Sequence, residues 1–203
     1  MTQPIPAFDP ATPHPRNAGT TFNTAARRCD NTSVGVLIHD SSNRLLVFDR
    51  ATPPWGVAGP AGHIDDHGSP ERAAATEVLE EVGLQAVSLD LLARRWRGNR
   101  CRRPAGPQGV GHEWWIYQAR ANGALAASAR EVRNARWVTP GQLQALTVRT
   151  TAYAHGGLPA EEWWAGPGVE PVWVLWLSLA GLVTATREDL AAIEQASTWL
   201  VRP

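Results

Sequence analysis

The stretch that decides the fold runs from Gly62 to Leu84 and reads GHIDDHGSPERAAATEVLEEVGL. Its middle carries the signals of a helix start, because serine caps helix N-termini well and proline fits the first helical position; these are Ser69 and Pro70. Gly83 is placed to end the helix. The sequence therefore predicts a well-delimited helix between Pro70 and Gly83.

The predicted helix has two faces, because residues three and four apart share a side. Its apolar residues cluster on one side: Ala75, Val78, Leu79 and Val82. Its carboxylates fall on another: Glu77, Glu80 and Glu81. Such a run is common on solvated helices, but the carboxylates repel one another, and a hard divalent cation such as Mg²⁺ would offset this repulsion.

The same stretch resembles the Nudix box in length and in most of its fixed positions. The matching residues are Gly62, Glu77, Val78, Glu80, Glu81, Gly83 and Leu84. Two positions depart from the family pattern: its first Glu is Gly68 here, and its Arg is Thr76. The resemblance covers roughly residues 33–146 and leaves the C-terminal third unexplained.

The resemblance implies an α/β fold, a Nudix-type α/β/α sandwich with a mixed sheet, here followed by a mostly helical C-terminal extension. It also implies that Glu77, Glu80 and Glu81 hold Mg²⁺, for which Mn²⁺ can substitute, with the Gly62 carbonyl as a further ligand. The missing Glu and Arg normally support these carboxylates. Asp65 or Asp66 is a candidate to supply part of that support.

The implied reaction is hydrolysis of a diphosphate linkage in a nucleotide derivative, with Glu80 and Glu81 as catalytic residues. The general base has no fixed place in this family. We take Glu131, which precedes Trp137 on a short predicted strand, as the best distant candidate. An exposed loop carboxylate is the simpler interpretation of Glu131.

Four arginines form the one dense basic cluster, and arginine can bind two phosphate oxygens at once. They are Arg97, Arg100, Arg102 and Arg103. They either clamp an anionic substrate or lie on a solvated loop. Trp55, and either Trp114 or Trp115, are candidates to stack on a base, although core packing is the simpler interpretation of each tryptophan.

The cysteines and loop histidines show no metal-binding spacing of their own. Cys29 and Cys101 are too few for a disulfide framework and form no Cys-x-x-Cys pair, which favours free thiols in a reducing cytosol. His63 and His67 are expected near the site, and His112 at the start of a strand.

Elsewhere, apolar runs predict strands at residues 33–38, 44–48, 87–96, 113–119 and 136–138. The first two, joined by a polar turn at residues 40–43, are expected to form a hairpin. Helices are expected from Pro140 through Leu146 and over about residues 187–200. We therefore expect a flexible arm at residues 1–24, a Nudix domain at 25–146 and a helical extension at 147–203 packed on it.

The chain has 19 basic and 19 acidic residues, so its net charge gives no general attraction to nucleic acid or membrane. We expect a small nucleotide substrate, no membrane segment, no nucleic-acid partner and a cytoplasmic location. The Trp-rich C-terminal region either covers the site or forms a homodimer interface.

Three functions remain open on the sequence. The first is a hydrolase, favoured by the complete set of box glutamates. The second is a non-catalytic nucleotide-binding or regulatory module, which the departures at Gly68 and Thr76 allow. The third is a prenyl diphosphate isomerase, which would need Cys101 as a catalytic residue.

Overall fold

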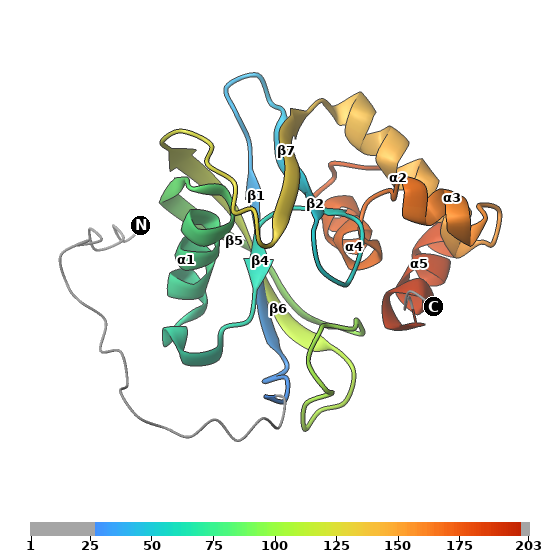
Figure 1. The fold of residues 1–203 in the computed structure, drawn as a ribbon, viewed down its shortest axis with the longest axis horizontal. Helices are drawn as coiled ribbons and strands as arrows, with labels where there is room; N and C mark the ends of the chain where they lie inside the picture. The colour runs from blue at the N-terminus through green and yellow to red at the C-terminus, as the bar shows by residue number, and fades with distance from the viewer. Residues whose placement is uncertain (1–26, 200–203) are drawn as a thin grey trace.

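The computed structural model describes residues 27–199, so the predicted arm at residues 1–24 lies outside the described residues. Figure 1 shows how the strands and helices of this part of the chain are arranged. Their bounds are β1 (Thr32–Ile38), β2 (Leu45–Arg50), β3 (Val57–Ala58), β4 (Ala61–Gly62), the short 3-10 helix η1 (Asp65–His67), α1 (Pro70–Val82), β5 (Gln85–Arg97), β6 (His112–Asn122), β7 (Val132–Val138), α2 (Pro140–Ala154), α3 (Ala160–Ala165), α4 (Pro171–Leu179) and α5 (Arg187–Trp199).

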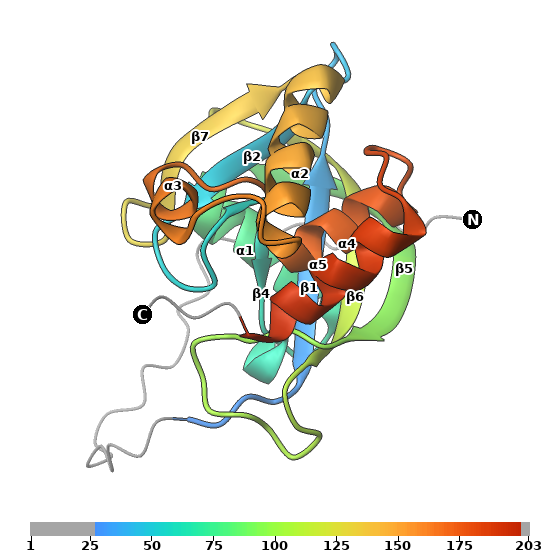
Figure 2. The ribbon, with the colours of Figure 1, turned by 90° about the vertical axis from the view of Figure 1, so that its right-hand side faces the viewer.

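The strands form two sheets. One has the order β4-β1-β6-β5 and is mixed, because β1 runs parallel to β6 while the other pairs are antiparallel. The second has the order β3-β2-β7 and is antiparallel. Helix α1 covers one side of the mixed sheet, and α2, α4 and α5 lie on the other (Figures 1 and 2). The expected α/β/α sandwich with a mixed sheet is confirmed.

The expected hairpin of β1 and β2 is wrong. The polar turn does form, with the Asp40 N–H donating to the Arg44 carbonyl at 3.0 Å. However, β1 is already paired with β4 on one edge and β6 on the other, so β2 starts the second sheet instead. A single bridge between His39 and Leu45 joins the two strands in the described part of the chain.

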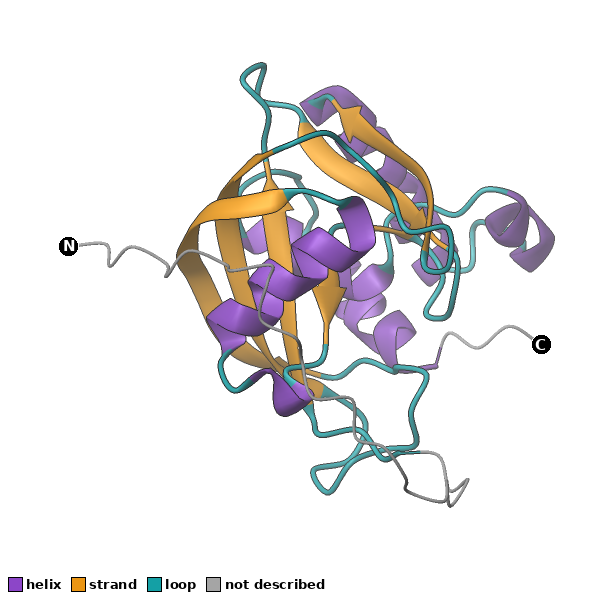
Figure 3. Ribbon diagram, turned by 60° about the vertical axis from the view of Figure 1, so that its left-hand side comes forward, coloured by secondary structure: helices purple, strands orange, loops and turns teal. Residues whose placement is uncertain are grey.

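Both ends of α1 follow the sequence prediction. The Ser69 hydroxyl accepts a hydrogen bond from the Arg72 N–H at 3.3 Å, and Gly83 ends the helix with φ of 73°, a left-handed conformation that glycine adopts easily. Figure 3 shows this helix crossing the face of the sheet. The buried face differs from the predicted one, because Leu79 is 37% exposed and Ala75 is only half-buried. The buried residues of the helix are Ala73, Ala74, Val78, Glu81 and Val82.

The C-terminal region is part of the core. Trp163, Trp173 and Trp176 are among the largest fully buried side chains, and the rings of Trp173 and Trp176 pack on Trp114 of β6 with centroids 6.4 and 6.1 Å away. Core packing is therefore the correct interpretation of these tryptophans. Helix α2 also continues past the predicted end at Leu146, so it spans the proposed domain boundary.

The C-terminal helix α5 matches the prediction closely, beginning at the expected residue 187. None of the helices within residues 27–199 combines the length and the apolar character needed to cross a membrane.

Candidate active site

A cavity of about 270 Å³ lies where the inner face of α1 meets β4 and three loops. The loops are residues 51–56, the basic loop 98–111 between β5 and β6, and the segment before β7. The three box glutamates and Gly62 all line this cavity: Gly62, Glu77, Glu80 and Glu81. The helical spacing that placed the glutamates on one face thus directs them into one space.

Two of the glutamates are held against the strand that precedes the helix. Glu81 is 5% exposed, and its Oε2 accepts a hydrogen bond from the Ala61 backbone N–H at 2.9 Å. The Glu77 carboxylate lies against Gly62, where a Cβ would come within 1.8 Å of Glu77 Oε1. The Gly62 carbonyl accepts a hydrogen bond from the Ser33 hydroxyl at 3.0 Å, which fixes its direction.

Burial and mutual repulsion make these carboxylates unusually weak acids. Burial raises the pKa of Glu77 to about 7, and the charges of Glu80 and Glu131 add to the rise. The charge of Arg50 opposes it. Burial, then the charge of Glu77, raises the pKa of Glu81 to about 8. Buried carboxylates that repel one another fit a divalent cation, because it supplies the missing positive charge and prefers oxygen ligands.

Arg50 and Glu170 are site residues that the sequence analysis missed. Arg50 ends β2, and its Nη1 lies 3.5 Å from Oε2 of Glu170, which precedes α4 and is 3% exposed. Burial raises the pKa of Glu170 to about 7, and Arg50 opposes the rise. A charged residue directly before the apolar run of α4 was the available signal, but it lies outside the region of family resemblance.

The basic loop 98–111 contributes three of its arginines to the cavity: Arg100, Arg102 and Arg103. Arg103 donates two hydrogen bonds of 2.7 Å to the Asp65 carboxylate, one to each oxygen. Arg102 lies 3.5 Å from Glu131, which also lines the cavity. The loop therefore brings the predicted phosphate-binding residues and the candidate base together.

Arg97, the fourth arginine of the predicted cluster, points elsewhere. Its Nη1 donates to Glu194 of α5 at 3.0 Å, and its guanidinium lies 5.2 Å from the ring centre of Trp176. Arg97 is the last residue of β5, so its direction is set by the sheet and not by the basic loop. The structure places it at the interface with α5.

Of the predicted stacking residues, Trp114 lines the cavity, whereas Trp55 and Trp115 do not. Trp115 lies on the opposite face of β6 from Trp114, because successive strand residues alternate, and its ring is covered by the guanidinium of Arg94 at 4.7 Å. Trp55 is half-buried on the loop after β2. Trp114 is the tryptophan that reaches the cavity, together with His63, His67 and His112.

The two departures from the box have local consequences. Gly68 follows η1 with φ of 84°, a conformation that favours glycine over the glutamate of the family pattern. Asp65, one of the acids expected to compensate, uses its carboxylate to bind Arg103, which lowers the pKa of Asp65. The side chain of Asp66 lies outside the described part of the structure.

Comparison with known proteins identifies the family of this chain. A family model described as NUDIX domain matches residues 30–155. A Bacillus subtilis (strain 168) protein named "Putative 8-oxo-dGTP diphosphatase" is 26% identical over 113 residues, which are 56% of this chain and 68% of that protein.

Two solved structures are among those similar to this chain. One is a MutT protein from Methanosarcina mazei Go1, with 18% identity and a TM-score of 0.47 over 58% of this chain and 83% of that one. The other is a Nudix hydrolase from Nitrosomonas europaea, with 19% identity and a TM-score of 0.44 over 57% and 76%. Because the family model matches more than half of this chain, the chain belongs to the Nudix family of hydrolases.

Proposed function

We propose that this chain is a Mg²⁺-dependent pyrophosphohydrolase that cleaves a diphosphate linkage in a nucleoside diphosphate derivative. The substrate class includes nucleoside triphosphates, nucleotide sugars and dinucleotides. The observation that carries the proposal is that Glu77, Glu80 and Glu81 line the same cavity as Arg100 and Arg102. A phosphate chain needs both groups, since metal ligands and arginines neutralise its charge from different sides.

The glutamates Glu77, Glu80 and Glu81 would hold Mg²⁺ or Mn²⁺, together with the Gly62 carbonyl. The raised pKa values of Glu77 and Glu81 support this assignment, because they reflect carboxylates that lack enough neighbouring positive charge. When bound, the metal ion supplies charge neutralisation on the phosphate oxygens and activation of water.

The remaining residues position the substrate and move the proton. Arg100 and Arg102 contact phosphate oxygens, while Trp114 forms an apolar wall of the cavity. A water oxygen bonds to phosphorus as the bridging P–O bond breaks, and Glu131 Oε1 accepts one proton of that water. The guanidinium of Arg102 lies 3.5 Å from this oxygen and directs the Glu131 carboxylate at the cavity.

The test is product release from a panel of nucleoside triphosphates, nucleotide sugars and dinucleotides, with and without Mg²⁺ in metal-depleted buffer. Glu81→Gln is compared with Glu161→Gln, a control on the exposed side of α3. We expect Glu81→Gln to lose about 100-fold or more in kcat/KM, because metal assistance is worth several kcal/mol. The control should retain wild-type rates.

The same variants are titrated with Mn²⁺ by electron paramagnetic resonance, which reads metal binding without turnover. Mn²⁺ binding that is weaker in Glu81→Gln but unchanged in Glu161→Gln supports the assigned ligands. The departures at Gly68 and Thr76 favour the alternative of a non-catalytic binding module. Nucleotide binding by the wild type, with no turnover of any compound, would establish that alternative instead.

A further inference from the structure

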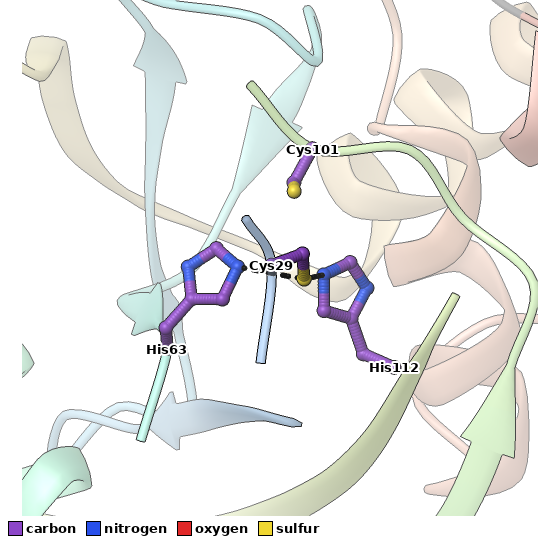
Figure 4. A group of neighbouring side chains, drawn as sticks. All are labelled: Cys29, His63, Cys101 and His112. Atoms are coloured by element: carbon purple, nitrogen blue, oxygen red, sulfur yellow. Dashed lines mark hydrogen bonds between the residues drawn. The ribbon is translucent and has the colours of Figure 1, made fainter. Parts of the chain in front are cut away.

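Four potential soft-metal ligands from distant parts of the chain meet at the wall of the cavity, and three of them, His63, Cys101 and His112, line it. Cys29 precedes β1, His63 follows β4, Cys101 lies in the basic loop 98–111, and His112 begins β6. One ligand atom from each lies within 4.8 Å of all the others. Figure 4 shows Cys29 between the two imidazoles, with the Cys101 sulfur directed toward the same space.

We propose that Cys29, His63, Cys101 and His112 bind one zinc ion in a tetrahedral Cys₂His₂ site. The Cys29 sulfur lies 3.3 Å from His63 Nε2 and 3.1 Å from His112 Nε2. Ligands at zinc's bond lengths of about 2.0–2.3 Å lie about 3.3–3.8 Å apart in a tetrahedron. The four side chains thus need only small shifts to surround an ion.

Both sulfurs already receive the backbone support that a bound thiolate needs. The Asn31 N–H donates to Cys29 Sγ at 3.3 Å, and the Arg103 N–H donates to Cys101 Sγ at 3.4 Å. In each case the donor is two residues after the cysteine, so two unrelated segments adopt the same local turn around their sulfur. Such hydrogen bonds orient the sulfur and offset its charge.

His112 is also oriented as a ligand. Its Nδ1 donates to the Asn99 side-chain oxygen at 2.9 Å, and that oxygen accepts a second hydrogen bond from Trp114 Nε1 at 3.1 Å. With the proton held on Nδ1, the lone pair of Nε2 faces Cys29. Metal-bound histidines in proteins are fixed in this way by a hydrogen bond from their other nitrogen.

The ligand types select zinc over the cation at the glutamates. Thiolate and imidazole suit zinc, whereas Mg²⁺ prefers carboxylate and water oxygens. Two thiolates balance the charge of Zn²⁺, so the occupied site is neutral, which suits the burial of Cys29 and His112 at 4% and 2% exposure. Four protein ligands leave no open position, which makes the site structural and not catalytic.

The site would fasten the basic loop to the sheet. Asn31 already holds this loop at its far end, because its side-chain amide donates to the Gly109 and Gly111 carbonyls at 3.0 and 2.7 Å. Zinc would add a further attachment at Cys101, directly between Arg100 and Arg102. His63 is adjacent to Gly62, so, if the proposed function holds, the ion sets the phosphate-binding arginines relative to the glutamates.

The first experiment measures the zinc content of the purified full-length protein and replaces zinc with Co²⁺. We expect one zinc per chain, and the cobalt form should show thiolate charge transfer and the visible bands of tetrahedral Co²⁺. Cys101→Ser and His63→Asn should weaken zinc binding by more than about 100-fold, since loss of an outer-sphere partner alone costs about 10–100-fold. His155→Asn, at an exposed histidine that ends α2 and pairs with Asp189, is the matched control.

Zinc removal from the wild type by a chelator, followed by its return, shows whether the fold survives without the ion and regains thermal stability with it. Zinc bound equally by Cys101→Ser but lost from Glu81→Gln would overturn the proposal, as would a Cys29–Cys101 disulfide in the purified protein. These readouts need no turnover. An intact zinc site in a chain without hydrolase activity would therefore overturn the proposed function alone.

Discussion

The carboxylate of Glu77 occupies the space where a side chain at Gly62 would begin, since a Cβ there would lie 1.8 Å from Oε1 and 2.2 Å from Cδ of Glu77. The backbone of Gly62 is not left-handed, so its lack of a side chain serves close approach and not an unusual turn. The glycine and the glutamate of the box thus form one packing unit across the β4–α1 junction.

Gly62→Ala should displace Glu77 and weaken Mn²⁺ binding by about 10-fold or more, with a similar fall in kcat/KM, because outer support of metal ligands is worth about 10–100-fold. The readouts are Mn²⁺ titration and hydrolysis rates. Gly141→Ala in α2 is the control, since its added Cβ meets no atom within 4 Å. Unchanged Mn²⁺ affinity in Gly62→Ala would show that Glu77 is not a metal ligand.

Arg102 and Arg97 form a second pair of test and control residues. They are near in sequence, but Arg102 lines the cavity and Arg97 contacts α5. Arg102→Ala should raise KM for the best substrate by about 10-fold, the effect of losing one charge-assisted hydrogen bond to phosphate. Arg97→Ala should leave KM unchanged and lower the thermal midpoint, because Arg97 contacts Glu194 and Trp176. Equal KM values in the two variants would show that Arg102 does not contact the substrate.

The glutamate face could be predicted because every signal for it is local. The cap at Ser69, the stop at Gly83 and the spacing of the glutamates lie within one helix, and side-chain direction in a helix follows from position alone. The same logic failed for Leu79, which is 37% exposed, since solvent access depends on what packs against the helix.

The rest of the site depends on contacts between distant segments. Glu170 reaches the cavity because α4 packs behind the sheet, and the Cys29 and Cys101 sulfurs meet because two loops close on one another. Neither arrangement leaves a spacing pattern in the sequence. The predicted β1–β2 hairpin was wrong for the same reason, because β1 pairs with β4 and β6, which are not its neighbours in sequence.

The buried Glu170 predicts how the stability of the fold depends on pH. Burial raises its pKa from 4.5 to about 7, so the folded state holds the proton more tightly than the unfolded state. The free energy of unfolding contributed by Glu170 therefore falls as pH rises from about 4.5 to about 7, and is level above that. The free energy of unfolding of Glu170→Gln should therefore rise relative to that of the wild type by up to about 3 kcal/mol between about pH 5 and pH 8.

Urea unfolding of both proteins at several pH values measures this difference, in which the shared contributions of Glu77 and Glu81 cancel. Glu188→Gln on the exposed face of α5 is the control and should follow the wild-type curve. A constant difference between Glu170→Gln and wild type at every pH would mean that Glu170 stays ionised throughout, paired with Arg50.

A substitution at Asn99 tests the zinc site without replacing any of its ligands. The side-chain oxygen of Asn99 accepts hydrogen bonds from His112 Nδ1 at 2.9 Å and Trp114 Nε1 at 3.1 Å, so Asn99→Ala frees the imidazole to rotate. We expect zinc affinity to fall about 10–100-fold while the cobalt spectrum of the saturated variant stays tetrahedral. The exposed Asn122→Ala is the control. Full zinc affinity in Asn99→Ala would mean that His112 is held by the backbone of β6 alone, and that the amide of Asn99 serves only to satisfy the buried indole of Trp114.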